Sequence, residues 1–173
     1  MMKKLILFIS ATLLFSCGVI QQNKAVDYNN SLIEEQEKVA DFINEFIEMV
    51  TTADTLSHTI IKEKRQKVLG RIDKSIENVK EIGGFKNSNE FQNSILNVFQ
   101  AYRNGVENEY TEMANYLLLP AEEQTPTRYF ETQDIAFVAD SLISIAEGDF
   151  MDAQKVFADK HNIQLAPVPA GNY

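Results

Sequence analysis

The chain has 173 residues, with 25 acidic against 16 basic side chains and a net charge of −9. Nucleic acids and anionic lipid headgroups bind proteins through Lys and Arg, so this charge argues against both as partners. The single cysteine, Cys17, excludes an intramolecular disulfide and a haem attached through Cys-x-x-Cys-His.

Residues 1–16 have the features of a lipoprotein signal peptide. Lys3 and Lys4 precede an apolar stretch, Leu5–Phe15, which is shorter than the ~20 residues of a membrane-spanning helix. The sequence Leu14-Phe15-Ser16-Cys17 is typical of the lipobox at which bacterial lipoproteins are acylated and cleaved. An ordinary secretory signal with an unrelated cysteine is the alternative.

Acylation at Cys17 would attach a diacylglyceryl group, often with a third chain on the new amino terminus. Two or more acyl chains form a stable anchor, since each buried CH₂ contributes ~0.8 kcal/mol. Gly18 stands where an aspartate retains some lipoproteins at the inner membrane, and the following residues lack an acidic export cluster. The sequence therefore predicts the periplasmic face of the outer membrane. Cleavage removes Lys3 and Lys4, so 14 basic and 25 acidic residues would leave a net charge of −11.

The rest of the chain is predicted to form one all-α domain. Residues 17–26 are expected to be a polar tether, residues 27–162 a helical bundle and residues 163–173 an extended tail. The prolines stand only at positions 120, 126, 167 and 169, and no segment alternates polar and apolar residues with period two.

The first helix is expected to begin near Ser31, because Ser31-x-x-Glu34 fits a capping box, and to end at about residues 51–54. The second is expected from about Ser57 to Ile82, with Gly83-Gly84 ending it. Apolar residues recur at helical spacing in both: Ile33, Ala40, Ile43, Phe46, Ile47 and Val50, then Ile61, Val68, Leu69, Ile72, Ile76 and Val79.

A third helix is expected from Asn87 or Ser88 to Pro120, with Asn87-x-x-Glu90 as its cap. The fourth is expected from near Tyr129 to about His161, after a loop over residues 120–128. The predicted inward residues are Phe91, Ile95, Val98, Phe99, Tyr102, Val106, Tyr110, Met113 and Leu117, then Ile135, Val138, Leu142, Ile145, Ala146, Phe150, Ala153 and Phe157.

Four amphipathic helices with short connections pack most simply as an up-down-up-down four-helix bundle. Every apolar stripe is then needed for the core, so no docking face is expected on the surface.

The segment GGFKNSNEFQNSILNVFQAYRNGVENEYTEMANYLLL, residues 83–119, resembles a family of small helical-bundle lipoproteins of Gram-negative bacteria. The resemblance extends to the lipobox, to Tyr28-Asn29 at the opening of the first helix and to an aromatic-rich third helix after a Gly-Phe turn. It implies an envelope lipoprotein with no known activity, so no functional residue is carried over.

The sequence offers no catalytic or metal constellation. Di-iron bundles use Glu-x-x-His pairs, but Thr55 and Ala158 stand three residues before His58 and His161. The two histidines are expected at opposite ends of the bundle, exposed and unable to share a triad. The acidic residues are expected to form a solvated outer face, with Asp149, beside Phe150, as the exception to examine: Glu107, Glu109, Glu112, Asp134, Asp140, Glu147, Asp149 and Asp152.

Two further patterns leave alternatives open. The third-helix aromatics Phe99, Tyr102, Tyr110 and Tyr116 are expected to be core, or else to line a groove for an apolar ligand. Gly70, Gly105 and Gly148 fall near mid-height of three helices, by chance or as a belt of close approach or a small cavity.

The sequence therefore predicts no enzyme, no cofactor and no metal. The expected function is a lipid-anchored module that binds another envelope protein. The alternatives are a carrier or sensor of a small apolar ligand held between the helices, an enzyme using carboxylates alone, and a structural spacer. The enzyme alternative requires a buried acid with a strongly raised pKa.

Overall fold

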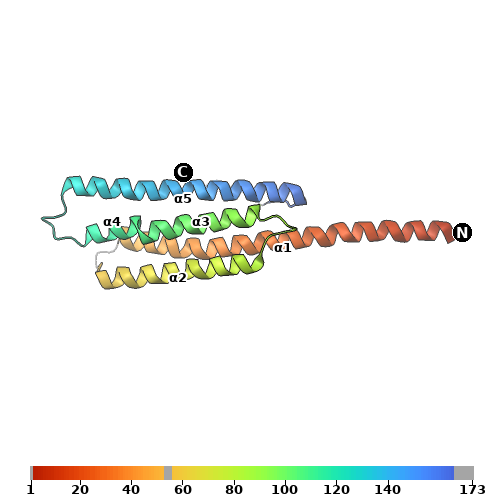
Figure 1. Cartoon of the computed structure of the whole chain (residues 1–173), viewed down its shortest axis with the longest axis horizontal. Helices are drawn as coiled ribbons and strands as arrows, with labels where there is room; N and C mark the ends of the chain where they lie inside the picture. The colour runs from red at the N-terminus through yellow and green to blue at the C-terminus, as the bar shows by residue number, and fades with distance from the viewer. Residues whose placement is uncertain (1, 53–55, 166–173) are drawn as a thin grey trace.

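The computed structural model describes the backbone of residues 2–52 and 56–165, and the side chains of residues 20–50 and 56–165. The helices are α1 (Met2–Thr52), α2 (His58–Ile82), α3 (Glu90–Glu107), α4 (Glu109–Leu117) and α5 (Pro126–His161). Because α3 and α4 follow one another along a single rod, the chain forms the predicted all-α four-helix bundle (Figure 1). Consecutive rods run in opposite directions in Figure 1, which is compatible with an up-down-up-down order.

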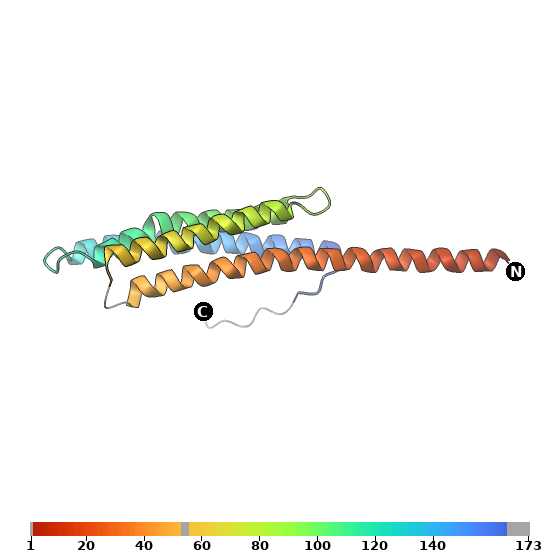
Figure 2. The same ribbon diagram turned by 90° about the horizontal axis from the view of Figure 1, so that it is seen from below.

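α1 begins well before the predicted start, and Figure 2 shows it extending beyond the other helices at its amino-terminal end. The Ser31 hydroxyl donates a hydrogen bond to the carbonyl of Asp27 at 2.8 Å, one turn earlier. Ser31 therefore lies inside the helix, and the predicted capping box is wrong. The core begins at the fully buried Ala25, within the segment expected to be a tether. Gln22 also donates to the carbonyl of Asn162 at 2.7 Å, beside the end of α5.

The bounds of α2 confirm the prediction closely. The Ser57 hydroxyl caps the helix by accepting a hydrogen bond from the amide of Ile60 at 3.3 Å. Gly83 ends it with φ 73°, a left-handed conformation that costs glycine nothing sterically.

The third rod differs from the prediction at its start and in its middle. Lys86 and Asn87 take φ 49° and 65° in a turn closed by two backbone hydrogen bonds between Phe85 and Ser88, so α3 begins only at Glu90. The helix is interrupted at Asn108, a residue type with low helix propensity. The hydroxyl of Thr111 donates to the carbonyl of Val106 at 2.6 Å and so provides this carbonyl with a partner at the interruption.

α5 begins earlier than predicted because Thr125 and Pro126 form a strong start signal. The Thr125 hydroxyl accepts from the amide of Arg128 at 3.3 Å, and Pro126 occupies the first turn, where no amide hydrogen is needed. The helix ends at Asn162 in a left-handed conformation, φ 54°.

The three mid-helix glycines do not form a common belt. A Cβ placed on Gly70 or Gly148 meets no atom within 4 Å, whereas one on Gly105 lies 3.1 Å from the Tyr110 ring and 3.4 Å from Ile143. Of the three, only Gly105 therefore marks a close approach, to the Tyr110 ring of α4 and then to Ile143 of α5.

Candidate functional site

The surface of α5 carries a large apolar face. Phe130, Phe137, Val138, Leu142 and Ile145 are between 52 and 72 % exposed, all within sixteen residues. Their spacing, with Val138, Leu142 and Ile145 at i, i+4 and i+7, gathers them on the side of α5 that points away from the bundle. These five residues are called the α5 outer face below.

This finding corrects two sequence predictions. Val138, Leu142 and Ile145 do not face inward, and the bundle does leave an apolar stripe unused. The inner side of α5 is instead formed by a second stripe of mostly small residues, which let α5 approach α3 and α4 closely: Thr132, Ala136, Ala139, Ile143, Ala146 and Phe150. Because α5 is apolar on both sides, periodicity alone does not select which side is buried.

Two tyrosine–carboxylate pairs hold the rotation of α5. The Tyr102 hydroxyl of α3 donates to Glu147, and the Tyr110 hydroxyl of α4 donates to Asp140 at 2.5 Å. Burial, followed by the hydrogen bond to Glu147, raises the pKa of Tyr102, and burial with the bond to Asp140 does the same for Tyr110. Asp140 and Glu147 lie two turns apart on α5, so both bonds point the same flank of the helix toward the third rod.

The charged side chains around the α5 outer face are all negative. Every charged residue from Tyr129 to Ala153 is acidic: Glu131, Asp134, Asp140, Glu147, Asp149 and Asp152. Asp140 and Glu147 bond the tyrosines, whereas Glu131, Asp134, Asp149 and Asp152 are exposed and form no ion pair with any described residue. Asp149, singled out from the sequence, is therefore one member of an acidic border.

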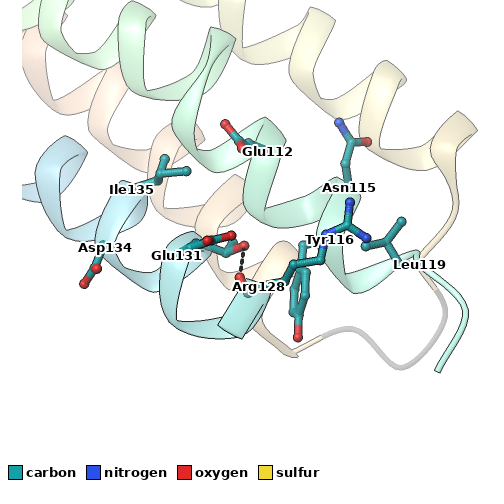
Figure 3. A pocket seen from close by; sticks show the side chains of 9 residues that line it. Glu112, Asn115, Tyr116, Leu119, Arg128, Glu131, Asp134 and Ile135 are labelled. Carbon is teal, nitrogen blue, oxygen red and sulfur yellow. Dashed lines mark hydrogen bonds between the residues drawn. The ribbon is translucent and has the colours of Figure 1, made fainter. Parts of the chain in front are cut away.

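An acidic cavity adjoins the amino-terminal end of this face, between α4 and the start of α5 (Figure 3). Its volume is about 580 Å³, and Figure 3 shows Glu112 of α4 across from Glu131 and Ile135 of α5, with Arg128 and Tyr116 at one end. Its other lining residues are Asn115, Leu119, Thr132 and Asp134. Three carboxylates against one guanidinium make the cavity suited to a cationic group.

Among the described residues, the one buried carboxylate has a structural role. Glu35 of α1 is 7 % exposed and accepts hydrogen bonds from Ser75 at 2.8 Å and Arg71 at 3.0 Å, both on α2. Burial acts to raise its pKa, but hydrogen bonds from Ser75, Lys38 and Asn78 outweigh it, and the pKa is lowered. A buried acid with a strongly raised pKa, which the carboxylate enzyme requires, is not found among the described residues.

The remaining predicted site residues are distributed without forming a reactive centre. His58 is exposed at the start of α2, and His161 lies at the end of α5, at the other end of the bundle (Figure 1). His161 is half-buried rather than exposed, since its ring packs 4.6 Å from that of Phe157. No group of three or more His, Cys, Asp or Glu suited to a metal occurs in the described part of the chain. The side chain of Cys17 lies outside the described residues.

The aromatic residues of the third rod are core, as expected, rather than the lining of an open groove, which was the alternative. Phe99, Tyr102, Tyr110 and Tyr116 are at most 9 % exposed. The cavity beside Tyr102 and Tyr110, between α1, the third rod and α5, measures about 220 Å³, less than the roughly 300–1,000 Å³ of typical ligand sites.

Comparisons of this chain with protein-family models, with curated proteins and with solved structures give no match. The resemblance to small helical-bundle lipoproteins thus stays a prediction from residues. Within the described helices, no stretch is both long and apolar enough to cross a membrane.

Proposed function

We propose that the chain is a lipid-anchored cell-envelope protein, attached to the outer membrane through Cys17, and that it is a non-enzymatic interaction module. Its α5 outer face binds an amphipathic helix of another envelope protein, whose apolar stripe is flanked by Lys and Arg. The lipobox and the signal-like start support the anchor. The exposure of five large apolar side chains on one helix face carries the binding proposal.

Exposed apolar residues scattered singly are ordinary, but a contiguous group is typical of an interaction site. Phe137 is 72 % exposed although it lies in the middle of an ordered helix, and Ile145, two turns later, is 62 % exposed. A helical partner fits this face best, because residues at i, i+4 and i+7 form the ridge that packs into the groove of a second helix.

The acidic border selects the charge of the partner. A second copy of the chain would bring the carboxylates of two α5 helices together, and like charges across an interface cost several kcal/mol. Anionic lipid would be repelled for the same reason. Lys or Arg beside the partner's apolar stripe would instead pair with Glu131, Asp134, Asp149 and Asp152, and one such side chain fits the cavity beside Glu112.

The test is native mass spectrometry of the lipidated protein extracted from its own membrane in mild detergent. The double variant Phe137→Glu/Ile145→Glu is compared with Ile60→Glu, which changes an apolar residue of α2 that is 39 % exposed. The wild type and Ile60→Glu are expected to carry a second polypeptide at fixed stoichiometry, and the double variant is expected to lose it.

Retention of the partner by the double variant contradicts the assignment of the α5 outer face. A homodimer, or a partner with no basic amphipathic helix, contradicts the assigned chemistry. A chain lacking the acyl mass on Cys17 contradicts the anchor independently of the binding result.

A further inference from the structure

A second cavity lies at the opposite end of α5 from Phe130, where α1, the 85–88 turn, the start of α3 and the end of α5 meet. Its volume is about 440 Å³, within the usual range of small-molecule sites. Five aromatic rings line it, with centroids 4.6–6.2 Å apart in their contacts: Tyr28, Phe85, Phe91, Phe157 and His161.

The hydroxyl of Tyr28 lacks a hydrogen-bond partner among the described residues. The Tyr28 side chain lines the cavity and is 8 % exposed, and the hydroxyl itself is buried. A buried hydroxyl without a partner costs about 1–3 kcal/mol, and the ring contacts of Tyr28 with Phe85, Phe91 and Phe157 do not supply one.

The charged residues that line this cavity are mostly basic, although the chain as a whole is acidic. Lys86 and Lys160 line it, opposed by the single carboxylate Glu90, in a protein whose net charge is −9. The Lys86 ammonium lies 5.4 Å from the centroid of the Phe85 ring and donates a hydrogen bond to Gln21 at 2.9 Å. The exposed positions of both lysines leave their charges available to a ligand.

We propose that this aromatic cavity binds a small, flat aromatic carboxylate. The ligand's ring packs among Tyr28, Phe85 and Phe157, and its carboxylate pairs with the ammonium groups of Lys86 and Lys160. Offset or edge-to-face contacts with several rings favour a planar aromatic body over a flexible chain. The two ammonium groups favour an anionic over a neutral head, since charge-assisted hydrogen bonds are the stronger ones.

The test is equilibrium dialysis of 2-naphthoate against the purified full chain, followed by naphthalene fluorescence, with the neutral 2-naphthamide as the matched probe. The wild type is expected to bind 2-naphthoate at least about tenfold more tightly than 2-naphthamide. Lys86→Met/Lys160→Met is expected to remove this preference, and both changes lie at exposed positions. Lys155→Met, on α5 outside the cavity lining, is expected to keep it.

Ala153→Leu places three more carbons in the cavity and is expected to weaken both probes equally. Equal affinity of the wild type for the two probes overturns the proposal, as does an unchanged preference in the double lysine variant. Binding that is lost in Phe137→Glu/Ile145→Glu but kept in Ala153→Leu shows that the probe occupies the α5 outer face, and this result also overturns it.

Discussion

The hydroxyl of Tyr110 donates a hydrogen bond to Asp140 at 2.5 Å, and this contact joins α4 to α5. Tyr102 bonds Glu147 two turns further along the same helix. The two bonds turn one flank of α5 toward the third rod, and Phe137 and Ile145 consequently face outward. The polar pairs inside the bundle and the apolar face outside it therefore lie on different sides of the same helix.

Replacement of both tyrosines by phenylalanine, Tyr102→Phe/Tyr110→Phe, should lower the free energy of unfolding at pH 8 by about 1 kcal/mol per lost hydrogen bond. The folded-state pKa of each tyrosine is raised, so their contribution is complete below the ordinary value of 10.0 and is lost as the pH rises above it. Urea denaturation at pH 8 and pH 10.5 should therefore show a larger alkaline loss for the wild type than for the double variant. Parallel losses in the two proteins would contradict this account.

Glu35→Ala should destabilise the bundle by about 3 kcal/mol, because it leaves the partly buried Arg71 without its carboxylate. Glu34→Ala is the control: Glu34 stands one residue earlier and pairs with Lys38, but its side chain is 66 % exposed, and its loss should cost less than about 0.5 kcal/mol. Urea denaturation of both variants measures the difference. The lowered pKa of Glu35 further predicts that its contribution, present above pH 4.5, disappears on acidification, so the two variants should converge in stability at low pH.

Gly70→Ala and Gly148→Ala should each stabilise the chain by about 0.5–1 kcal/mol, since the added methyl group meets open space and alanine favours the helix. Gly105→Ala should instead destabilise it by about 1 kcal/mol, because the methyl group presses on the ring of Tyr110, which its bond to Asp140 holds in place. Thermal denaturation gives the sign of each change. Equal stabilisation by all three substitutions would show that the Tyr110 ring does not press on position 105.

His161 should make the bundle sensitive to mild acid. Burial, with the nearby charges of Lys86 and Lys160, lowers its folded-state pKa below the ordinary 6.5, so the unfolded chain takes up a proton first. Stability should therefore fall as the pH drops from 7.5 through 6.5, and more in the wild type than in His161→Gln. An identical pH dependence in both proteins would show that the His161 ring is fully solvated.

The parts of this fold that were predictable from sequence are those with one local signal. Ser57 and Gly83 bound α2 because a cap and a left-handed glycine act within a few residues. Ser31 gave a wrong helix start because serine can either cap a helix or bond a backbone carbonyl inside one. Here its hydroxyl donates to the carbonyl of Asp27 within α1. The interruption at Asn108 carries no signal beyond low helix propensity.

The α5 outer face could not be predicted from the sequence for a different reason. Val138 and Ala139 are adjacent, and both belong to apolar stripes with helical period, so the pattern of α5 fits two different rotations of the helix about its axis. In the structure Tyr102 and Tyr110 bond α5 in one of these two rotations, and both lie some 30–45 residues earlier in the chain, beyond the reach of local periodicity. The acidic residues from Glu131 to Asp152 can be read from the sequence. That they border an apolar face could be recognised only once the structure showed which residues of α5 are exposed.

The most direct test of the α5 outer face is photo-crosslinking in intact cells with benzoylphenylalanine at position 138. The crosslinked peptide is identified by mass spectrometry, and position 60 on α2 serves as the control. We expect a crosslink from position 138, and none from position 60, to a single partner helix whose apolar residues are flanked by Lys and Arg. A crosslink from position 138 to this chain's own residues or to lipid, or equal labelling from both positions, would contradict it.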